Sequence, residues 1–235
     1  MDMPKVAIVA ALEREVLPLV RHWRIIKREH SGRSFRFFEN GEIVVVCGGI
    51  GAEAARRATE AAIMMYAPGM VYSVGFAGAL EPRLKIGDIV VPRRVVNAAD
   101  GSSVDTGTGE GVLVSFSSVA SPEQKAKLGA SFGAQAVDME AAVVALAAQA
   151  RGVRFAAVKA ISDQSHFALP AMDNFIAPGG TFRTWKFALS VLIRPWMYKS
   201  VLTLARNSNQ ASHALCNWLG RMNENLMAEQ FAEKP

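Results

Sequence analysis

The sequence predicts an α/β protein, and three observations support that class. Short runs of β-branched residues alternate with alanine-rich stretches of helical spacing, as in a sheet whose strands are joined by helices. Glycines and carboxylates stand where several of these runs end. At 235 residues, of which 51% are hydrophobic, the chain can bury one sizeable core more easily than two.

Strands and helices alternate in the first half of the chain. The predicted elements are a buried strand over 5–12, a helix over 13–24, strands over 33–39 and 42–47, and a helix over 52–66. Asn40-Gly41 is the strongest hairpin signal, because both central residues of a type I′ turn need positive φ. Gly48-Gly49-Ile50-Gly51 precedes the second helix and matches neither dinucleotide nor Walker spacing, so a structural turn is favoured over a phosphate cradle.

The second half continues this alternation. The predicted elements are strands ending at 74, 96 and 117, helices from 121 and over 141–151, and a last buried strand over 153–161. Residues 97–111 are rich in Asp, Ser, Thr and Gly and predict an exposed loop. Beyond Pro170 the pattern is helical, with breaks near 178–180 and at Arg194-Pro195. We expect a catalytic domain over 1–180 and a helical C-terminal extension over 181–235, packed on it or continuous with it.

Cysteine usage and the N-terminus favour a cytoplasmic protein. Cys47 and Cys216 are far apart beside apolar residues, which argues against a disulfide framework. Residues 1–5 have no cationic segment followed by an apolar signal core. The four histidines form no metal-ligand spacing. We expect neither a metal nor an organic cofactor.

The excess of positive charge is concentrated near the C-terminus. Between Asp173 and Glu224 there are six basic residues and three of the four tryptophans, but no acidic residue. This pattern suits an amphipathic helix on an anionic membrane surface and argues against a nucleic-acid partner. Arg194-Pro195 and Lys199 interrupt the apolar run, so it should not cross a bilayer. We expect peripheral contact with the inner face of the membrane through 181–221. A helical cap or an oligomer contact is the alternative.

Two acidic turns, Asp138-Met139-Glu140 and Ser162-Asp163, carry the strongest functional signal. Each lies where a strand should end or a helix begin, and ligands of open α/β sheets bind beyond the carboxyl ends of the strands. Asp163 follows an apolar strand, where a purely structural role is hard to argue. For Glu140 a helix-dipole role stays open, and for Glu15 the pattern allows either a helix cap or a catalytic group.

Six motifs in register resemble one family. They are Ala7–Val16, Gly49–Gly51, Gly75–Gly78, Gly87–Val91, Val137–Ala141 and Ala160–Asp163. Over about residues 5–165 their order and spacing resemble the purine nucleoside phosphorylase and methylthioadenosine/adenosylhomocysteine nucleosidase superfamily. The resemblance implies a central mixed β-sheet, partly closed into a barrel and flanked by helices. It also implies cleavage of the N-ribosidic bond of a purine nucleoside.

The resemblance assigns roles to individual residues. Asp163 matches the acid that protonates the purine N7, and an aspartate there suits adenine. Glu140 matches the residue that binds the ribose hydroxyls, and Glu15 matches the carboxylate that orients the attacking water. The other residues expected at the substrate are Leu12, Gly75, Phe76, Val119, Ala120, Asp138, Met139, Lys159 and Ser162. Met139 is expected to pack on the sugar, while Val119 and Ala120 fall where the family stacks the base.

The chain departs from the family at two positions on the nucleophile side. Phe76 replaces a small hydroxyl residue, and Lys159 replaces an arginine, which keeps the charge but loses the bidentate fork. Whether water or phosphate attacks is therefore open.

A second, narrower resemblance concerns the C-terminal extension. Arg194-Pro195-Trp196, Leu204–Ser208 and Ala214–Cys216 resemble the hopanoid-associated phosphorylases, thought to remove adenine from adenosylhopane. We therefore expect release of adenine from a 5′-substituted adenosine, with lipid-linked adenosylhopane favoured. A soluble methylthioadenosine/adenosylhomocysteine nucleosidase, a purine nucleoside phosphorylase and a non-catalytic nucleoside-binding protein are the alternatives. We expect a homodimer or a higher homo-oligomer.

Overall fold

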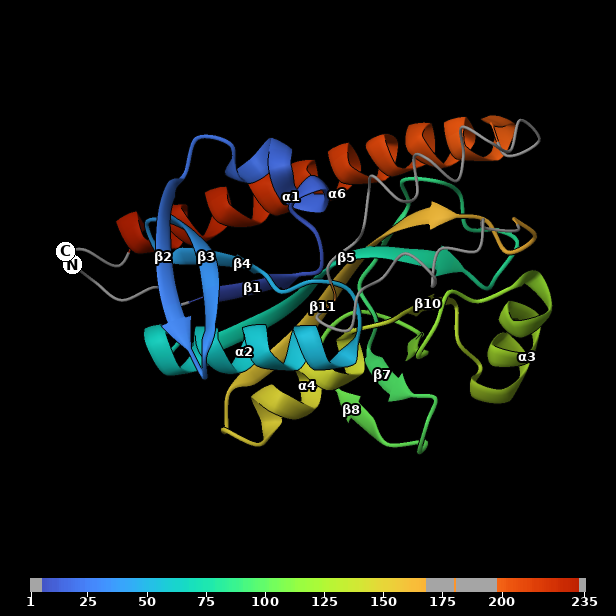
Figure 1. Ribbon diagram of the computed structural model, residues 1–235, viewed down its shortest axis with the longest axis horizontal. Coiled ribbons are helices and arrows are strands. Elements are labelled where there is room, and N and C mark those ends of the chain that lie inside the picture. Colours follow the sequence, from blue (N-terminus) through green and yellow to red (C-terminus); the bar gives the residue numbers. More distant parts are fainter. Residues whose placement is uncertain (1–5, 168–179, 181–197, 233–235) are drawn as a thin grey trace.

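A mixed β-sheet forms the centre of the protein, and helices cover both of its faces (Figure 1). The computed structural model describes residues 6–167, 180 and 198–232, with the side chains of the last range described from 200 to 222. The described residues form an 11-stranded sheet that contains both parallel and antiparallel pairs. The predicted α/β class, the mixed sheet and the C-terminal helix are confirmed.

The strands lie along most of the chain. They are β1 (Val6–Ala10), β2 (Arg24–His30), β3 (Arg33–Asn40), β4 (Ile43–Cys47), β5 (Met70–Ala79), β6 (Ile89–Val90), β7 (Arg94–Asn97), β8 (Ser103–Asp105), β9 (Val112–Ser115), β10 (Ala136–Asp138) and β11 (Arg154–Asp163). The helices are α1 (Glu13–Val20), α2 (Ala52–Tyr66), α3 (Pro122–Phe132), α4 (Ala141–Gln149) and α6 (Tyr198–Ala232).

Strand β2 corrects the prediction of a helix extending to residue 24. Helix α1 ends at Val20, and β2 is an edge strand with mostly exposed residues, so it lacks the alternation that identifies a half-buried strand. Ser31 and Gly32 join β2 to β3 with φ of 49° and 73°, which makes this the type I′ turn. The predicted β3–β4 hairpin is confirmed, but its central residues are Gly41 and Glu42, and of these only Gly41 has positive φ.

Strands β5 and β8 also differ from the predictions. Strand β5 continues through the glycines beyond Val74 to Ala79. Strand β8 lies inside the predicted loop and pairs with β7. Its three residues are too few and too exposed to produce a recognisable alternation in the sequence.

Strand β5 is the point at which the sheet divides. One edge of β5 pairs with β1 over residues 70–74 and then with β10 at residues 78–79, while β11 follows its other edge. Between Val74 and Gly78 neither β1 nor β10 is paired with the first edge. The two halves of the sheet separate there, and the end of β1 lies across an opening from the end of β10.

The two faces of the sheet are packed differently. Helices α2 and α4 cover one face with small buried residues such as Ala58, Ala62 and Ala145, which allow a close approach to the sheet. Helices α1 and α6 cover the other face (Figure 1). Their buried side chains are larger and include Val16 and Leu215.

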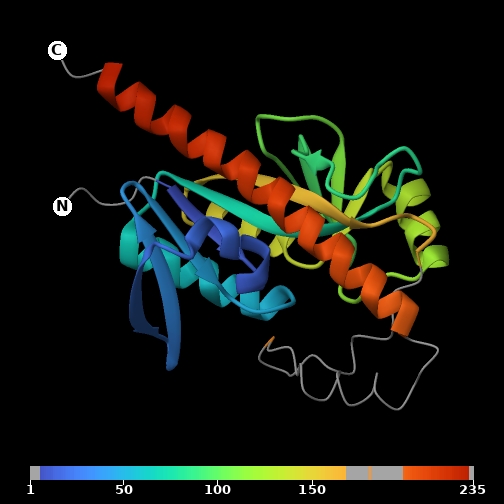
Figure 2. The same cartoon turned by 90° about the horizontal axis from the view of Figure 1, so that it is seen from above.

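Helix α6 crosses the sheet above β5 and β11 and packs beside α1 (Figure 2). Its buried residues Ala211, Leu215 and Leu219 belong to the core, and Trp218 packs against them. This part of the helix is therefore a structural cap. Of the predicted break near 178–180 the structure describes only Gly180. The predicted break at Arg194-Pro195, together with Trp185 and Trp196, lies outside the described residues. Among the helices that the structure describes, none is long and apolar enough to span a bilayer.

Leu215→Ala is expected to lower the free energy of unfolding by about 2–5 kcal/mol, because it removes a fully buried leucine from a close-packed core. Leu202 is 64% exposed on the same helix, so Leu202→Ala is the matched control and should have little effect. Urea unfolding followed by circular dichroism measures both. Equal stability of the two variants would show that α6 does not cap the core.

Candidate active site

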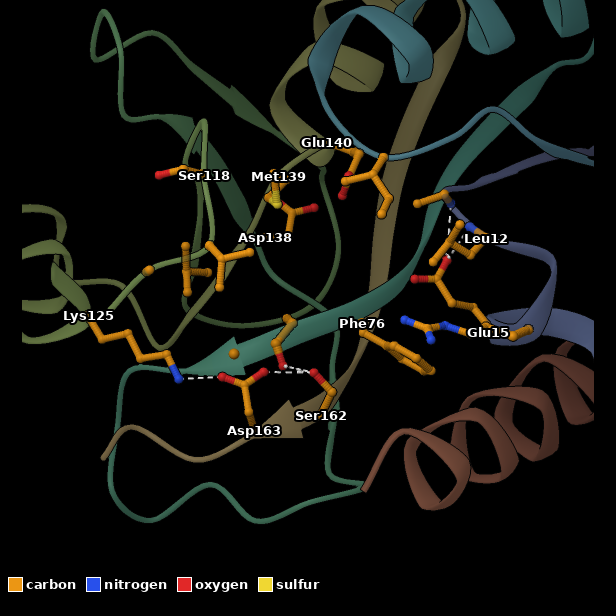
Figure 3. Close-up of a pocket in the computed structure, with 18 residues that line it drawn as sticks. Leu12, Glu15, Phe76, Ser118, Lys125, Asp138, Met139, Glu140, Ser162 and Asp163 are labelled. Carbon is orange, nitrogen blue, oxygen red and sulfur yellow. Dashed lines mark hydrogen bonds and ion pairs between the residues drawn. The ribbon is translucent and has the colours of Figure 1, made fainter. Parts of the chain in front are cut away.

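A pocket opens where β5 changes its pairing partner (Figure 3). The residues that line it are Ala11, Leu12, Arg14, Glu15, Ile50, Phe76, Ala77, Gly78, Ser118, Val119, Ala120, Lys125, Val137, Asp138, Met139, Glu140, Ser162 and Asp163. They come from the ends of β1, β10 and β11, from the second half of β5, from α1 and α3, and from the loops that precede α2, α3 and α4. The carboxyl ends of strands thus supply much of the lining, as expected.

The structure brings together all of the predicted site residues except Gly75 and Lys159, which do not line the pocket. Gly75 has a φ of 151°, and a Cβ there would lie 3.1 Å from Glu15 Oε2. Its lack of a side chain makes room for the carboxylate. Lys159 is fully buried and forms an ion pair with Asp138. Asp138 lines the pocket, so Lys159 lies behind it.

A bulge near the end of β11 places Asp163. The register of β11 against β5 shifts between Ile161 and Asp163, which interrupts the alternation of side chains and lets both Ser162 and Asp163 reach the pocket. Asp163 is 4% exposed, and its Oδ1 accepts a 2.8 Å hydrogen bond from Ser162 Oγ. A Cβ at Gly78 would lie 2.8 Å from Asp163 Oδ2, so the glycine makes this close approach feasible.

Lys125 is a pocket residue that the sequence analysis missed. It lies on α3, is 1% exposed, and its Nζ forms an ion pair with Asp163 Oδ2. The same nitrogen donates a 2.8 Å hydrogen bond to the carbonyl oxygen of Gln164. The apolar residue Leu128 on the same side of α3 was the only nearby hint that this helix face is buried, and such a pattern does not identify a buried lysine.

Asp138 is the centre of a buried polar network. It accepts hydrogen bonds from Ser115 Oγ at 2.5 Å and from the backbone N–H of Ala141 at 2.9 Å. Lys159 Nζ lies 2.9 Å from its Oδ2 and donates to Ser73 Oγ at 3.0 Å. Burial alone would lower the pKa of Lys159, but the charges of Asp138 and Glu140 raise it above its usual value. The positive charge of Lys159 is therefore held and compensated below the pocket surface.

Glu140 contacts the glycine turn that precedes α2. Its Oε1 accepts a 2.8 Å hydrogen bond from the backbone N–H of Gly51, and its side chain does not cap α4. The turn thus binds a carboxylate of the protein, which supports its interpretation as a structural turn. Burial, and then the charge of Asp138, raise the pKa of Glu140 to about 7, against the opposing effects of Lys159 and the Gly51 N–H. Near neutral pH this group can either donate or accept a proton.

Glu15 reaches back from the first turn of α1. Its Oε2 accepts backbone N–H bonds from Ala11 at 3.1 Å and from Leu12 at 3.0 Å, so the carboxylate does cap its own helix. Among the described residues both bonds end on Oε2, which leaves Oε1 for a bound molecule. Burial raises the pKa of Glu15, and the Leu12 N–H opposes that effect. Cap and catalyst are therefore compatible roles for this residue.

Helix α6 holds the Glu15 turn in place. Ser212 Oγ lies 3.0 Å from the carbonyl oxygen of Arg14 and 3.1 Å from that of Glu15. Cys216 Sγ lies 3.6 Å from the Glu15 carbonyl oxygen. The C-terminal helix therefore positions a pocket residue as well as covering the core.

The raised pKa of Glu140 is expected to make stability depend on pH. Between pH 4.5 and about 7 the folded protein retains a proton that the unfolded chain has lost, so the free energy of unfolding falls as pH rises through this window. The slope is at most about 1.4 kcal/mol per pH unit. Glu140→Gln should flatten the dependence in urea unfolding, whereas Glu110→Gln, at an exposed residue, should not. An unchanged slope in Glu140→Gln would contradict this assignment.

The described part of the chain contains no cluster of His, Cys, Asp or Glu that could hold a metal ion. The charged groups that the pocket offers are carboxylates, a paired lysine and Arg14, beside apolar walls. Acid–base chemistry on a ligand with hydroxyl groups fits this set of residues.

The sequence relationships agree with the architecture. Residues 5–128 and 108–179 match the phosphorylase superfamily. The 5'-methylthioadenosine/S-adenosylhomocysteine nucleosidase of Actinobacillus succinogenes is 30% identical over 197 residues, which cover 68% of this chain and 85% of that protein. The protein with the same name from Buchnera aphidicola subsp. Schizaphis graminum is 30% identical over 93 residues, which cover only 38% of this chain and 40% of that protein. The chain belongs to the phosphorylase superfamily.

Solved structures share the fold. The futalosine hydrolase of Helicobacter pylori strain 26695 superimposes with a TM-score of 0.71 at 21% identity, covering 95% of this chain and 98% of that one. The 5'-methylthioadenosine/S-adenosylhomocysteine nucleosidase of the same species, in complex with butyl-thio-DADMe-Immucillin-A, gives a TM-score of 0.70 at 22% identity. That alignment covers 96% of this chain and 100% of the other.

Proposed function

We propose that the protein cleaves the N-ribosidic bond of a 5′-substituted adenosine and releases adenine. The observation that carries this proposal is the convergence of Asp163, Glu140 and Glu15 on one pocket from three separate elements (Figure 3). Relatives with nucleosidase names and the shared fold support the same reaction class.

The three carboxylates suit the charges that develop during such a reaction. As the bond breaks, C1′ becomes oxocarbenium-like and the leaving adenine becomes negative. Asp163 would deliver a proton to N7, and its buried surroundings would strengthen the interaction. Glu140 would bind the ribose hydroxyls, with Met139 against the sugar. Glu15 Oε1 would accept a proton from the attacking water and keep its oxygen directed at C1′.

Water is the nucleophile that we propose. Among the described lining residues the cations are Arg14 and Lys125, and Lys125 is paired with Asp163. Lys159 is paired with Asp138 behind the surface. A phosphate dianion at the nucleophile position would face the carboxylate of Glu15. Among the described lining cations, only Arg14 is not in an ion pair and could offset that negative charge. Electrostatic repulsion therefore favours water over phosphate.

For the 5′ substituent we propose the lipid of adenosylhopane. The resemblance of the C-terminal extension to the hopanoid-associated phosphorylases supports it, whereas the nucleosidase relatives favour 5′-methylthioadenosine or S-adenosylhomocysteine. Phe76 and Leu12 give the pocket apolar walls that could accept either kind of substituent.

Adenine release from all three nucleosides, measured by liquid chromatography with and without inorganic phosphate, tests these proposals. We expect release from adenosylhopane to have the highest kcat/KM and to be independent of phosphate. Formation of a ribose 1-phosphate product would overturn the hydrolytic proposal, and a preference for 5′-methylthioadenosine would overturn the lipid substrate. Binding without turnover would identify a nucleoside-binding protein instead.

We further propose that residues 1–180 form the catalytic domain, and that the extension over 181–235 gives a cytoplasmic protein peripheral contact with the membrane. The six basic residues between Asp173 and Glu224 support this, since each Lys or Arg near an anionic surface contributes about 1 kcal/mol. Co-sedimentation with anionic vesicles should occur at low salt and weaken at high salt or in a Trp196→Glu, Lys199→Glu variant. Absence of co-sedimentation at low salt would leave the extension as a cap.

A homodimer or larger homo-oligomer is also proposed. Met64 and Leu146 are 66% and 38% exposed on the adjacent helices α2 and α4, and an interface over these helices would cover them. Sedimentation equilibrium tests the assembly, and a monomer at micromolar concentration would contradict it.

A further inference from the structure

The ion pair between Lys125 and Asp163 is buried at the pocket wall. The side chains are 2% and 5% exposed, and both residues line the pocket. Lys125 comes from α3 and Asp163 from the end of β11, so the pair exists only in the folded protein. Breaking such a pair leaves an uncompensated buried charge. A buried ion pair is stable only where its geometry is good and its remaining polar atoms are hydrogen-bonded. The contacts of both partners indicate what this pair can do.

Both oxygens of Asp163 act as hydrogen-bond acceptors. Oδ2 accepts from the Lys125 ammonium, and Oδ1 lies 2.8 Å from Ser162 Oγ. The serine hydroxyl has one proton, and its contact with Asp163 is shorter than the 3.4 Å contact with the carbonyl oxygen of Ala77. In this arrangement Asp163 acts as a hydrogen-bond acceptor through both of its oxygens. It therefore presents no O–H of its own to a leaving base.

Lys125 is the adjacent group that does carry protons. Its ammonium has three N–H donors, one directed at Asp163 and one at the Gln164 carbonyl oxygen. Transfer of a proton from Lys125 to Asp163 converts two buried charges into two neutral groups, so the apolar surroundings favour this step more than water would. The pair can thus become an amine and a carboxylic acid without separating charge.

We propose that Lys125 supplies, through Asp163, the proton that the leaving base takes up. This inference rests on the proposed function. An N–H bond of Lys125 breaks as an O–H bond forms on Asp163. That O–H bond then breaks as N7–H forms, while the electron pair of the C1′–N9 bond passes to the base. Lys125 is left as a neutral amine and regains a proton released when water adds to C1′. Lys125 acts through Asp163 and is a positioning and proton-supplying residue.

Two leaving groups separate this role from a purely structural one. Adenine requires protonation as it leaves, whereas 4-nitrophenolate leaves as a stable anion from a 4-nitrophenyl riboside with the same 5′ substituent. A defect in proton supply should therefore affect adenine release alone. A disordered pocket should affect both reactions, because the ribose and nucleophile contacts are common to them.

The informative variants are Lys125→Gln, Lys125→Arg and Asp163→Asn, with Lys127→Gln as the matched control on an exposed position of the same helix. Glutamine keeps an N–H donor toward Asp163. Arginine keeps the ion pair and the fold's charge balance, but it does not release its proton. We expect all three to lower kcat for adenine release by about 10²-fold or more, and to keep 4-nitrophenol release within about threefold of the wild type. Lys127→Gln should match the wild type in both assays.

Near-wild-type adenine release by Lys125→Gln or Lys125→Arg would overturn the inference. If Lys125→Arg were the active variant, the role of Lys125 would be electrostatic only. Equal loss of both products in Lys125→Arg would also overturn it, by showing that the lysine shapes the pocket. A wild-type protein that releases no adenine from any 5′-substituted adenosine would instead overturn the proposed function, and this inference with it.

Discussion

Asp163→Asn is expected to lower adenine release from the preferred 5′-substituted adenosine by about 10²–10⁴-fold, equivalent to roughly 3–5.5 kcal/mol of activation free energy. The asparagine amide has nearly the same shape as the carboxylate but cannot transfer a proton to N7. Binding of the nucleoside should persist, because Glu140 and the apolar walls are unchanged. The loss should therefore appear in kcat more than in KM.

Steady-state assays of adenine formation measure this effect. Asp100→Asn is the matched control, since Asp100 is exposed in the loop between β7 and β8. Because Asp163→Asn leaves Lys125 without its buried counter-charge, thermal unfolding should accompany the kinetics. Near-normal turnover in a folded Asp163→Asn variant would remove Asp163 from the acid role.

Glu15→Gln is expected to lower kcat by about 10²-fold or more with little change in KM, because an amide cannot accept the proton of the attacking water. The fold should tolerate the change, since the amide oxygen can still accept the backbone N–H bonds of Ala11 and Leu12. Glu13→Gln is the neighbouring control on the same helical turn, where the carboxylate pairs with Arg36 at the surface.

Glu140→Gln provides the contrast to Glu15→Gln. It should raise KM and lower kcat together, because we expect Glu140 to bind the ribose hydroxyls in the ground state and to bind them more strongly in the transition state. If Glu15→Gln turned over at the wild-type rate, Glu15 would be a helix cap and nothing more. If the two variants behaved alike, the separate roles of nucleophile and ribose carboxylates would be wrong.

Much of the candidate site could be predicted from the sequence because its residues stand at the ends of recognisable elements. Asp163 ends an apolar strand, Glu140 precedes a helix, and Glu15 lies in the first turn of one. Strand ends that lie at the same edge of a sheet bring such residues close together. The order of the motifs also resembled that of a known family, and this resemblance predicted that the three carboxylates share one pocket.

Other features had no local signal. Strand β2 is an exposed edge strand, and β8 is short, so neither shows the alternation on which a sequence prediction depends. The helical pattern near the C-terminus did predict a helix. The sequence pattern did not show whether the apolar face of this helix contacts a membrane, a partner or the core. For residues 211–219 the packing of α6 against α1 and β11 shows that it contacts the core.

Periodicity and turn chemistry are local properties of the chain, so the α/β class, the order of most strands and helices, and the carboxylates at the pocket could be predicted from the residues alone. Which charges pair depends on how the elements pack. Lys125 meets Asp163 across 38 residues, and Lys159 turns to Asp138 instead of lining the pocket. Each pair joins side chains from different elements, and its strength depends on how deeply both are buried. The local sequence pattern does not show how deeply a given charged residue is buried. The proton chemistry of the pocket could therefore be inferred only from the packed structure.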